Sequence, residues 1–213
     1  MVEIPDTAAG TWLDVSRPLA NGIPVWPGDR PFRVETRHVG KMVLTSFETT
    51  CHVGTHVDAP LHMEGRGSTV DALPINLFLG TAEVVDARRA ARRVGLGDLP
   101  EGWIPRAPRV LLRTRSQPLE AVAVREDLSG LDVGLVHFLA DRDVLLVGTD
   151  SPSVDPFDST GFEAHHALAK RGLTWIEGLN LEAAEPGLYT LVALPLALVG
   201  TEAAPVRAIL KKL

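Results

Sequence analysis

The sequence centres on one stretch, Cys51-His52-Val53-Gly54-Thr55-His56-Val57-Asp58-Ala59-Pro60-Leu61-His62. It places three of the seven histidines of the chain, and one carboxylate, within residues 52–62. Imidazole and carboxylate groups are the ligands that bind zinc and similar divalent ions, provided that several of them converge. The alternative is a polar strand with scattered core histidines, but such residues rarely cluster without forming a site. The stretch therefore predicts a metal centre.

The spacing within this stretch distinguishes a strand from a helix. On a helix, His52 and His56 share a face, but Asp58 points away. On a strand, residues 52, 54, 56 and 58 face one side, and Gly54 leaves that side open between the histidines. A straight strand would hold His52 and His56 roughly 13 Å apart at about 3.3 Å per residue, too far for one ion. We therefore expect the backbone to bend near Gly54 and Pro60 to end the strand.

Length and charge narrow the class of protein. The 213 residues predict a single domain, residues 1–213, with a sizeable hydrophobic core. The net charge of −6 gives no basic footprint for nucleic acid. The one basic cluster, Arg88-Arg89-Ala90-Ala91-Arg92-Arg93, predicts a solvated surface.

Cysteine content and hydropathy predict a cytoplasmic protein. Cys51 is the only cysteine, so no internal disulfide can form and an oxidising compartment gains no support. The N-terminal residues 1–6 lack the cationic and apolar pattern of a signal peptide. The longest apolar run, Leu191 to Val199, is too short to span a bilayer. We therefore expect no membrane contact.

The order of the secondary structure elements indicates an α/β fold. The first half reads mostly as strands and loops, with strands at 13–15, 34–36, 43–48 and 81–86 and a short helix at 74–79. The second half alternates strands at 110–112, 144–147, 173–176 and 188–194 with helices at 132–140 and 161–171. Such alternation implies parallel pairing through right-handed crossovers. We predict one compact α/β domain with a mixed, barrel-like sheet and peripheral helices.

A second group of potential ligands lies in the second half of the chain. His165 falls inside a predicted helix, and Glu177 ends the strand that follows it. His166 points roughly 100° away from His165 and is left out. Three His/Asp ligands suit one catalytic metal with an open position. Adding His165 and Glu177 supplies enough ligands for two ions, with Asp58 as a bridge, and two ions about 3.5–4 Å apart can activate one hydroxide.

Other chemistries find little support. No serine lies in a G-x-S-x-G elbow. The chain has no Walker-type phosphate loop, and Gly95-Leu96-Gly97 lacks the third glycine of a dinucleotide fingerprint. Trp26, in the loop Pro24 to Asp29, could pack in the core or form a flat wall for a ring-bearing substrate; because aromatic residues mostly serve burial, the core position is favoured.

The quoted stretch resembles the H-x-G-T-H-x-D-x-P-x-H signature of the cyclase-like metal-dependent hydrolases. The likeness covers nearly the whole chain and is strongest to the bacterial kynurenine formamidases. Their W-D-x-S-x-P-L and P-x-W-P-G-D segments are similar to residues 12–19 and 24–29. Residues 150–156 and the pair His165 and Glu177 are also like theirs. Two departures concern the substrate: Thr55 stands where formamidases often carry alanine, and Leu13 separates Trp12 from Asp14.

The resemblance implies a role for each residue of the two clusters. It implies a first ion held by His52, His56 and Asp58, and a second ion held by Asp58, His165 and Glu177. It also implies that His62 is the catalytic acid/base and that Trp26 contacts the substrate, against the core position favoured above. The family fold is a swivelling β/β/α domain, assembled as a homodimer or larger oligomer, and its members use zinc or sometimes manganese.

The reaction implied by the resemblance is hydrolysis of the formamide of N-formyl-L-kynurenine to L-kynurenine and formate, a step of tryptophan degradation, by a metal-activated hydroxide. The same machinery on a cyclic amide such as isatin is the alternative within the superfamily. A non-catalytic metal-binding module is the alternative from another class. It would have a coordinatively closed site, whereas His62 is left over after a plausible count of ligands.

Overall fold

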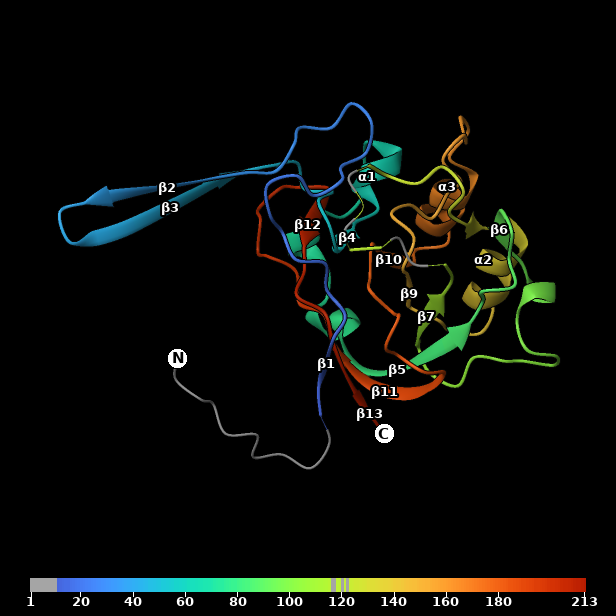
Figure 1. Ribbon diagram of the computed structural model, residues 1–213. Coiled ribbons are helices and arrows are strands. Elements are labelled where there is room, and N and C mark those ends of the chain that lie inside the picture. Colours follow the sequence, from blue (N-terminus) through green and yellow to red (C-terminus); the bar gives the residue numbers. More distant parts are fainter. Residues whose placement is uncertain (1–10, 116–117, 120, 122) are drawn as a thin grey trace.

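A single mixed sheet forms the body of the protein in the computed structural model, which describes residues 11–115, 118, 119, 121 and 123–213 (Figure 1). The strand order is β1-β13-β11-β5-β7-β9-β10-β4-β12. These strands are β1 (Leu13–Asp14), β4 (His56–Asp58), β5 (Leu79–Asp86), β7 (Arg109–Arg113), β9 (Leu146–Thr149), β10 (Thr174–Glu177), β11 (Gly187–Val192), β12 (Ala203–Pro205) and β13 (Ile209–Lys212). Strands β5, β7, β9 and β10 are parallel, and the remaining pairs are antiparallel.

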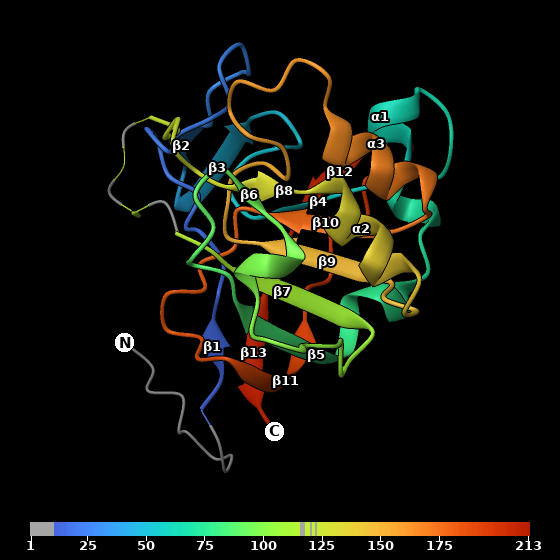
Figure 2. The same cartoon turned by 90° about the vertical axis from the view of Figure 1, so that its right-hand side faces the viewer.

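The central strands are buried on both faces, as their apolar sequences require. Along β7, Leu111 faces one core cluster, whereas Val110 and Leu112 face the other. The second cluster lies beneath α2 (Val133–Ala140) and α3 (Glu163–Lys170), which lie on the same side of the sheet (Figure 2). The first cluster lies within the curl of the sheet and includes side chains of β5, β11 and β13. The predicted mixed, barrel-like α/β domain is confirmed.

Smaller elements surround this sheet. Two parallel strands, β6 (Arg93–Val94) and β8 (Gly130–Leu131), form a separate pair. The helix α1 (Leu61–Glu64) directly follows β4. Single 3₁₀ turns cover Val70–Ala72, Ile75–Phe78 and Leu96–Asp98. In the part of the chain that the structure describes, no helix has the length and hydropathy needed to cross a membrane.

The antiparallel hairpin of β2 (Arg33–Val39) and β3 (Met42–Glu48) extends away from the body (Figure 1). Every residue of β3 is exposed, including Met42, Val43, Leu44 and Phe47. This apolar surface is unusual because a two-stranded hairpin alone is at best marginally stable in water.

Most of the predicted strands are confirmed, as are the two helices predicted in the second half of the chain, and three details differ. The segment 74–79, predicted as a short helix, forms a 3₁₀ turn at Ile75–Phe78, and β5 begins at Leu79. The helix predicted at 161–171 begins at Glu163, because Phe162 adopts a left-handed conformation with φ +47°. The strands β12 and β13 were not predicted. The N-terminal residues 1–6, which lack a signal-peptide pattern, lie outside the described residues, so the extent of the domain over residues 1–213 stays a prediction.

Candidate metal centre and active site

The turn before β4 brings His52 back toward His56. Gly54 has φ +61°, which is the left-handed region that glycine adopts without a steric penalty. A Cβ at this position would lie 2.6 Å from Cδ2 of Leu19. The ring centroids of His52 and His56 are 5.1 Å apart, well short of the separation along a straight strand. The predicted bend at Gly54 is therefore confirmed, and only residues 56–58 are regular strand.

The register of β4 against β10 brings three polar side chains together. His56 and Asp58 are two residues apart and share a face of β4. Glu177 lies directly opposite His56 on β10, and Trp175 lies opposite Asp58. The Nε2 atom of His56 is 3.5 Å from Oδ1 of Asp58 and 3.4 Å from Oε2 of Glu177. The indole of Trp175 donates a hydrogen bond of 2.8 Å to Oδ2 of Asp58.

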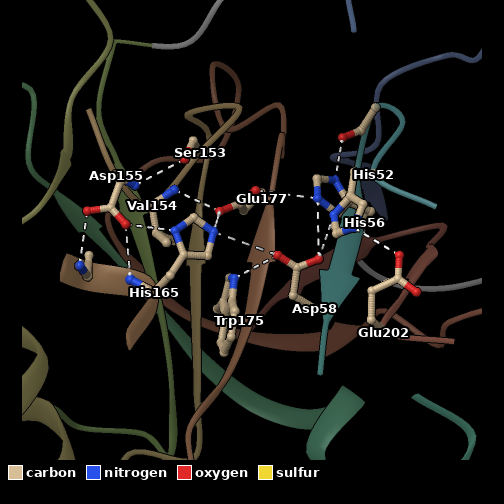
Figure 3. Close-up of polar contacts among 12 residues, drawn as sticks. His52, His56, Asp58, Ser153, Val154, Asp155, His165, Trp175, Glu177 and Glu202 are labelled. Carbon is tan, nitrogen blue, oxygen red and sulfur yellow. Dashed lines mark hydrogen bonds and ion pairs between the residues drawn. The ribbon is translucent and has the colours of Figure 1, made fainter. Parts of the chain in front are cut away.

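The helix α3 supplies His165 to the same cluster (Figure 3). Its Nε2 atom lies 3.2 Å from Oε1 of Glu177 and 4.0 Å from Oδ2 of Asp58. His165 is buried, whereas the neighbouring His166 is exposed, as the helical geometry predicts. Sequence positions more than a hundred residues apart thus meet in one cluster. The five predicted ligands are His52, His56, Asp58, His165 and Glu177, and the structure brings all five together.

The cluster is strongly charged despite its burial. Burial alone would lower the pKa of His165, but hydrogen bonds to Asp155 and Glu177 outweigh it and raise this pKa to about 10. Burial likewise opposes protonation of His52, yet Asp58 raises its pKa to about 9. Burial would raise the pKa values of Asp58 and Glu177, but the surrounding imidazoles lower both. Cationic imidazoles therefore balance the two carboxylates in the metal-free cluster.

The residues of the cluster fit a divalent cation. Nε2 of His56 and Oδ1 of Asp58 are buried, and no group within the described residues forms a hydrogen bond of good geometry with either atom, although buried polar atoms are nearly always paired. One potential ligand atom each from His52, His56 and Asp58 lie within 4.8 Å of one another. A second such group contains Asp58, His62 and His165. Imidazole and carboxylate ligands in this number suit a divalent metal.

His62 stands apart from the other histidines. It lies in α1, with its ring centroid 4.4 Å from that of His52 and 5.6 Å from that of His165. Burial lowers its pKa, and the neighbouring histidines lower it further, although Asp58 opposes them. Its ring is therefore the neutral one of the group at pH 7. The distances allow His62 to act as a ligand or to carry a proton beside the cluster.

A cavity of about 340 Å³ opens onto the cluster. The residues that line it include the aromatic side chains of Trp26 and Phe162 and the cluster residues His52, His56, His62, His165 and Glu177. Trp26 is half-buried, belongs to neither core cluster, and packs against Phe157 with ring centroids 5.2 Å apart. The core position favoured by the residue pattern is therefore wrong, because Trp26 lines the cavity instead of joining a core cluster.

Sequence reasoning missed several polar residues that hold the cluster. Asp155 and Glu202 hydrogen-bond His165 and His52, and Trp175 donates to Asp58. The hydroxyl of Thr55 accepts from the backbone N–H of Arg17 at 2.8 Å and donates to the carbonyl of Gly178 at 2.7 Å. Residues 150–156 carried a signal in their likeness to the formamidases. Glu202 carried none, because nothing near it in the sequence points to its partner.

Comparison with known proteins finds similarity over most of the chain. Residues 13–156 match the family described as "Putative cyclase". The kynurenine formamidase of Salinibacter ruber is 41% identical over 204 residues, which cover 93% of this chain and 96% of that protein. The kynurenine formamidase of Bacillus cereus is 35% identical over 204 residues, covering 94% of this chain and 97% of that protein.

Solved structures share the fold. A predicted metal-dependent hydrolase from Bacillus stearothermophilus superposes with a TM-score of 0.83 at 30% identity, covering 97% of this chain and 100% of that chain. The isatin hydrolase A of Labrenzia aggregata superposes with a TM-score of 0.81 at 20% identity, covering 95% of this chain and 93% of that chain. At 20% identity the second likeness concerns the fold alone.

Proposed function

This chain belongs to the cyclase family of metal-dependent hydrolases, and we propose that it hydrolyses N-formyl-L-kynurenine to L-kynurenine and formate. It is an enzyme of the metal-dependent arylformamidase type. The full-length similarity to several kynurenine formamidases favours this substrate class. The observation that carries the proposal is the buried cluster of three histidines and two carboxylates at a cavity walled by Trp26.

We assign the five cluster residues as ligands of two divalent ions, with zinc as the expected metal and manganese as the alternative. His52, His56 and Asp58 would hold one ion, and Asp58, His165 and Glu177 the other. The unpartnered atoms of His56 and Asp58 support this assignment. When bound, divalent ions in such a site supply Lewis acidity that lowers the pKa of water and polarises a carbonyl oxygen.

His62 is the residue we assign to proton transfer. Hydrolysis forms a bond between a water oxygen and the formyl carbon and breaks the bond from that carbon to the arylamine nitrogen. One proton must pass from the attacking water to the departing nitrogen. The neutral ring of His62 can accept this proton and return it. Its lowered pKa and its position beside the ligands support this role.

Trp26 is the residue we assign to binding the aromatic ring of the substrate. Its indole lies on the wall of the cavity, which also has the apolar side chains of Ile23 and Phe162. The closed, non-catalytic metal module predicts no such cavity beside the ligands. An aromatic wall facing a polar cluster is instead suited to an aryl ring that carries a hydrolysable amide.

The test compares the two candidate amides after metal analysis of the purified protein. Turnover of N-formyl-L-kynurenine and of isatin is measured before chelation, after chelation, and after zinc is restored. We expect faster turnover of the formamide, its loss on chelation and its recovery with zinc. Faster turnover of isatin would overturn the formamidase assignment, and hydrolysis that survives complete metal removal would overturn the metal-dependent one.

We also propose that the protein acts as a homodimer. The exposed apolar residues of the β2–β3 hairpin support this assembly, because a surface of this kind marks a contact with another chain. Val34, Val43 and Phe47 lie on one face of the hairpin. Val39, Met42 and Leu44 lie on the other, so both faces carry apolar side chains. The cytoplasmic location stays a prediction from the sequence.

A further inference from the structure

Each of the three histidines among the assigned ligands has its outer ring nitrogen held by an oxygen. Nδ1 of His165 lies 2.7 Å from Oδ2 of Asp155, and Nε2 of His52 lies 3.2 Å from Oε1 of Glu202. Nδ1 of His56 lies 3.1 Å from the carbonyl oxygen of Gly54. Carboxylate and carbonyl oxygens accept hydrogen bonds, so each outer nitrogen carries the proton. The inner nitrogen of each ring is then left to bind a metal.

Asp155 is a rigid acceptor. It is buried, and its carboxylate accepts hydrogen bonds from the backbone N–H groups of Ala164 and His165 at 3.0 and 3.1 Å. These groups belong to the first turn of α3, which carries His165 itself. The backbone N–H of Asp155 donates to Oγ of Ser153 at 3.1 Å. Asp155 consequently holds both the backbone N–H and the ring Nδ1 of His165.

Glu202 is a much weaker acceptor. Its side chain is 40% exposed, and His52 is the more exposed histidine of its pair with His56, at 19% against 3%. Water competes for an exposed charged hydrogen bond, so such a contact contributes little. The backbone of Glu202 is nevertheless held in position beside the cluster, because its carbonyl accepts a hydrogen bond of 2.8 Å from the N–H of Ala59.

We propose that Asp155 and Glu202 are positioning residues of unequal strength, which hold His165 firmly and His52 loosely and so make the ion at His52, His56 and Asp58 the first to exchange. The inference rests on the assignment of two ions above. It concerns metal affinity, so it can be tested whichever amide the enzyme hydrolyses.

The test is a zinc titration of the metal-free protein in competition with a chromophoric chelator. We expect two binding steps in the unsubstituted protein. Glu202→Ala should weaken the weaker step by about 10-fold, the lower end of the range for such partners, and leave the tighter step unchanged. Asp155→Asn should weaken the tighter step more strongly, by about 100-fold. Two variants that weaken the same step, or a Glu202→Ala protein with unchanged affinity, would overturn the proposal, as would a single zinc equivalent in the unsubstituted protein.

Matched variants distinguish the loss of a positioning contact from a change in net charge and from a failure to fold. Glu182→Gln and Asp158→Asn each remove an exposed carboxylate outside the cluster, and neither should alter the titration. Glu202→Gln, which keeps an acceptor but loses the charge, should fall between Glu202→Ala and the unsubstituted protein. If Asp155→Asn fails to fold because α3 loses its contacts, the effect of Glu202→Ala on a single step still decides the outcome.

A spectroscopic readout tests the positioning directly. Long-range ¹H–¹⁵N spectra of protein labelled in its histidines report which ring nitrogen carries the proton. In the zinc-loaded protein we expect His165 to carry it on Nδ1 and His52 on Nε2. Glu202→Ala should broaden or shift the His52 signals and leave those of His165 in place. An unchanged His52 spectrum would show that Glu202 does not position this ring.

Discussion

Among the histidines that line the site, His62 is the one that we assign to proton transfer and not to metal binding. Its imidazole lies beside the assigned ligands, and among the residues that the structure describes it has no outer hydrogen bond like those that hold His52, His56 and His165. A histidine that accepts and returns a proton needs one ring nitrogen that no metal ion occupies. A ligand would instead be expected to have its second nitrogen held.

We therefore expect His62→Ala to lower kcat for the formamide about 10²–10⁴-fold while zinc content stays near two equivalents. Turnover and metal content are measured on the same preparation. His137→Ala is the matched control, because His137 is exposed on α2, outside the site and the hairpin. Loss of one zinc equivalent in His62→Ala would make His62 a ligand, in line with its grouping with Asp58 and His165.

Proton release should accompany metal binding. Hydrogen bonds and nearby carboxylates raise the pKa of His165 to about 10 and that of His52 to about 9 in the metal-free cluster, against burial. Both rings are thus protonated at pH 7, and a metal requires them neutral. Protonation stabilises the metal-free fold below the ordinary histidine pKa of 6.5, and this contribution is lost as the pH rises through about 9 to 10.

Zinc affinity should accordingly rise between pH 7 and pH 9, and binding at pH 7 should release protons. Calorimetry in two buffers of different ionisation enthalpy counts the protons released per zinc ion. The same heat in both buffers would mean that the rings are already neutral in the metal-free protein.

Residue spacing predicted that His52, His56 and Asp58 converge, because these residues lie close together in the sequence. The alternation of 52, 54, 56 and 58 and the glycine between the histidines carry the geometry of the first half of the site within seven residues. The positioning contacts could not be predicted in this way. Glu202 meets His52 across 150 positions, and the pairing that joins them depends on β12, a three-residue strand of alanine and proline.

At the scale of the elements, the antiparallel pairing of β4 with β10 holds the two halves of the site together. It places Glu177 opposite His56, and the chain then turns at Gly178 with φ +65°. A Cβ on Gly178 would overlap the carbonyl oxygen of Gly54, the residue that bends the chain toward His52. The turn at Gly178 can therefore approach the turn at Gly54 only because residue 178 has no Cβ. No local sequence pattern predicts this contact.

Gly178→Ala should destabilise the protein more than Gly172→Ala. Both glycines have left-handed dihedrals, φ +65° and φ +70°, but nothing lies within 4 Å of a Cβ at position 172. Gly172→Ala should cost about 1–2 kcal/mol from the backbone conformation alone. Gly178→Ala should cost about 1–3 kcal/mol more, because its neighbour is backbone and must move. Urea unfolding of the metal-free proteins measures the free energy of unfolding of both variants. Equal decreases would mean that the turn at Gly54 moves to accommodate the new Cβ at little cost.

Some elements could be predicted from the sequence and others could not. The strand β9 is buried on both faces. A run of apolar residues is typical of such a strand, so it could be recognised from the sequence. The strands β12 and β13 are three and four residues long, and β13 ends in two lysines. They form because β12 pairs with β4, and β13 pairs with β1 and β11. Tertiary pairing determines such strands, and local propensity does not.

At the scale of the whole molecule, the β2–β3 hairpin is the feature that the single chain does not explain. Both strands are long, seven residues each, yet the hairpin projects from the body with its apolar side chains exposed (Figure 1). Burial of a sheet face is what normally stabilises such a ribbon. A second copy of the chain, related by a two-fold axis, would cover both hairpins at once through an isologous contact.

Val43→Glu should therefore convert a dimer into a monomer. Val43 is 59% exposed and shares a face with His38, so glutamate would fit the isolated chain but leave a charge buried in the interface. Light scattering after size exclusion should give twice the chain mass of 22.9 kDa for the unsubstituted protein and for Ile104→Glu, which alters an equally exposed residue of the body. Val43→Glu should give the mass of one chain. A monomeric unsubstituted protein at micromolar concentration would contradict the assignment, and a dimer that tolerates Val43→Glu would move the interface to another face of the molecule.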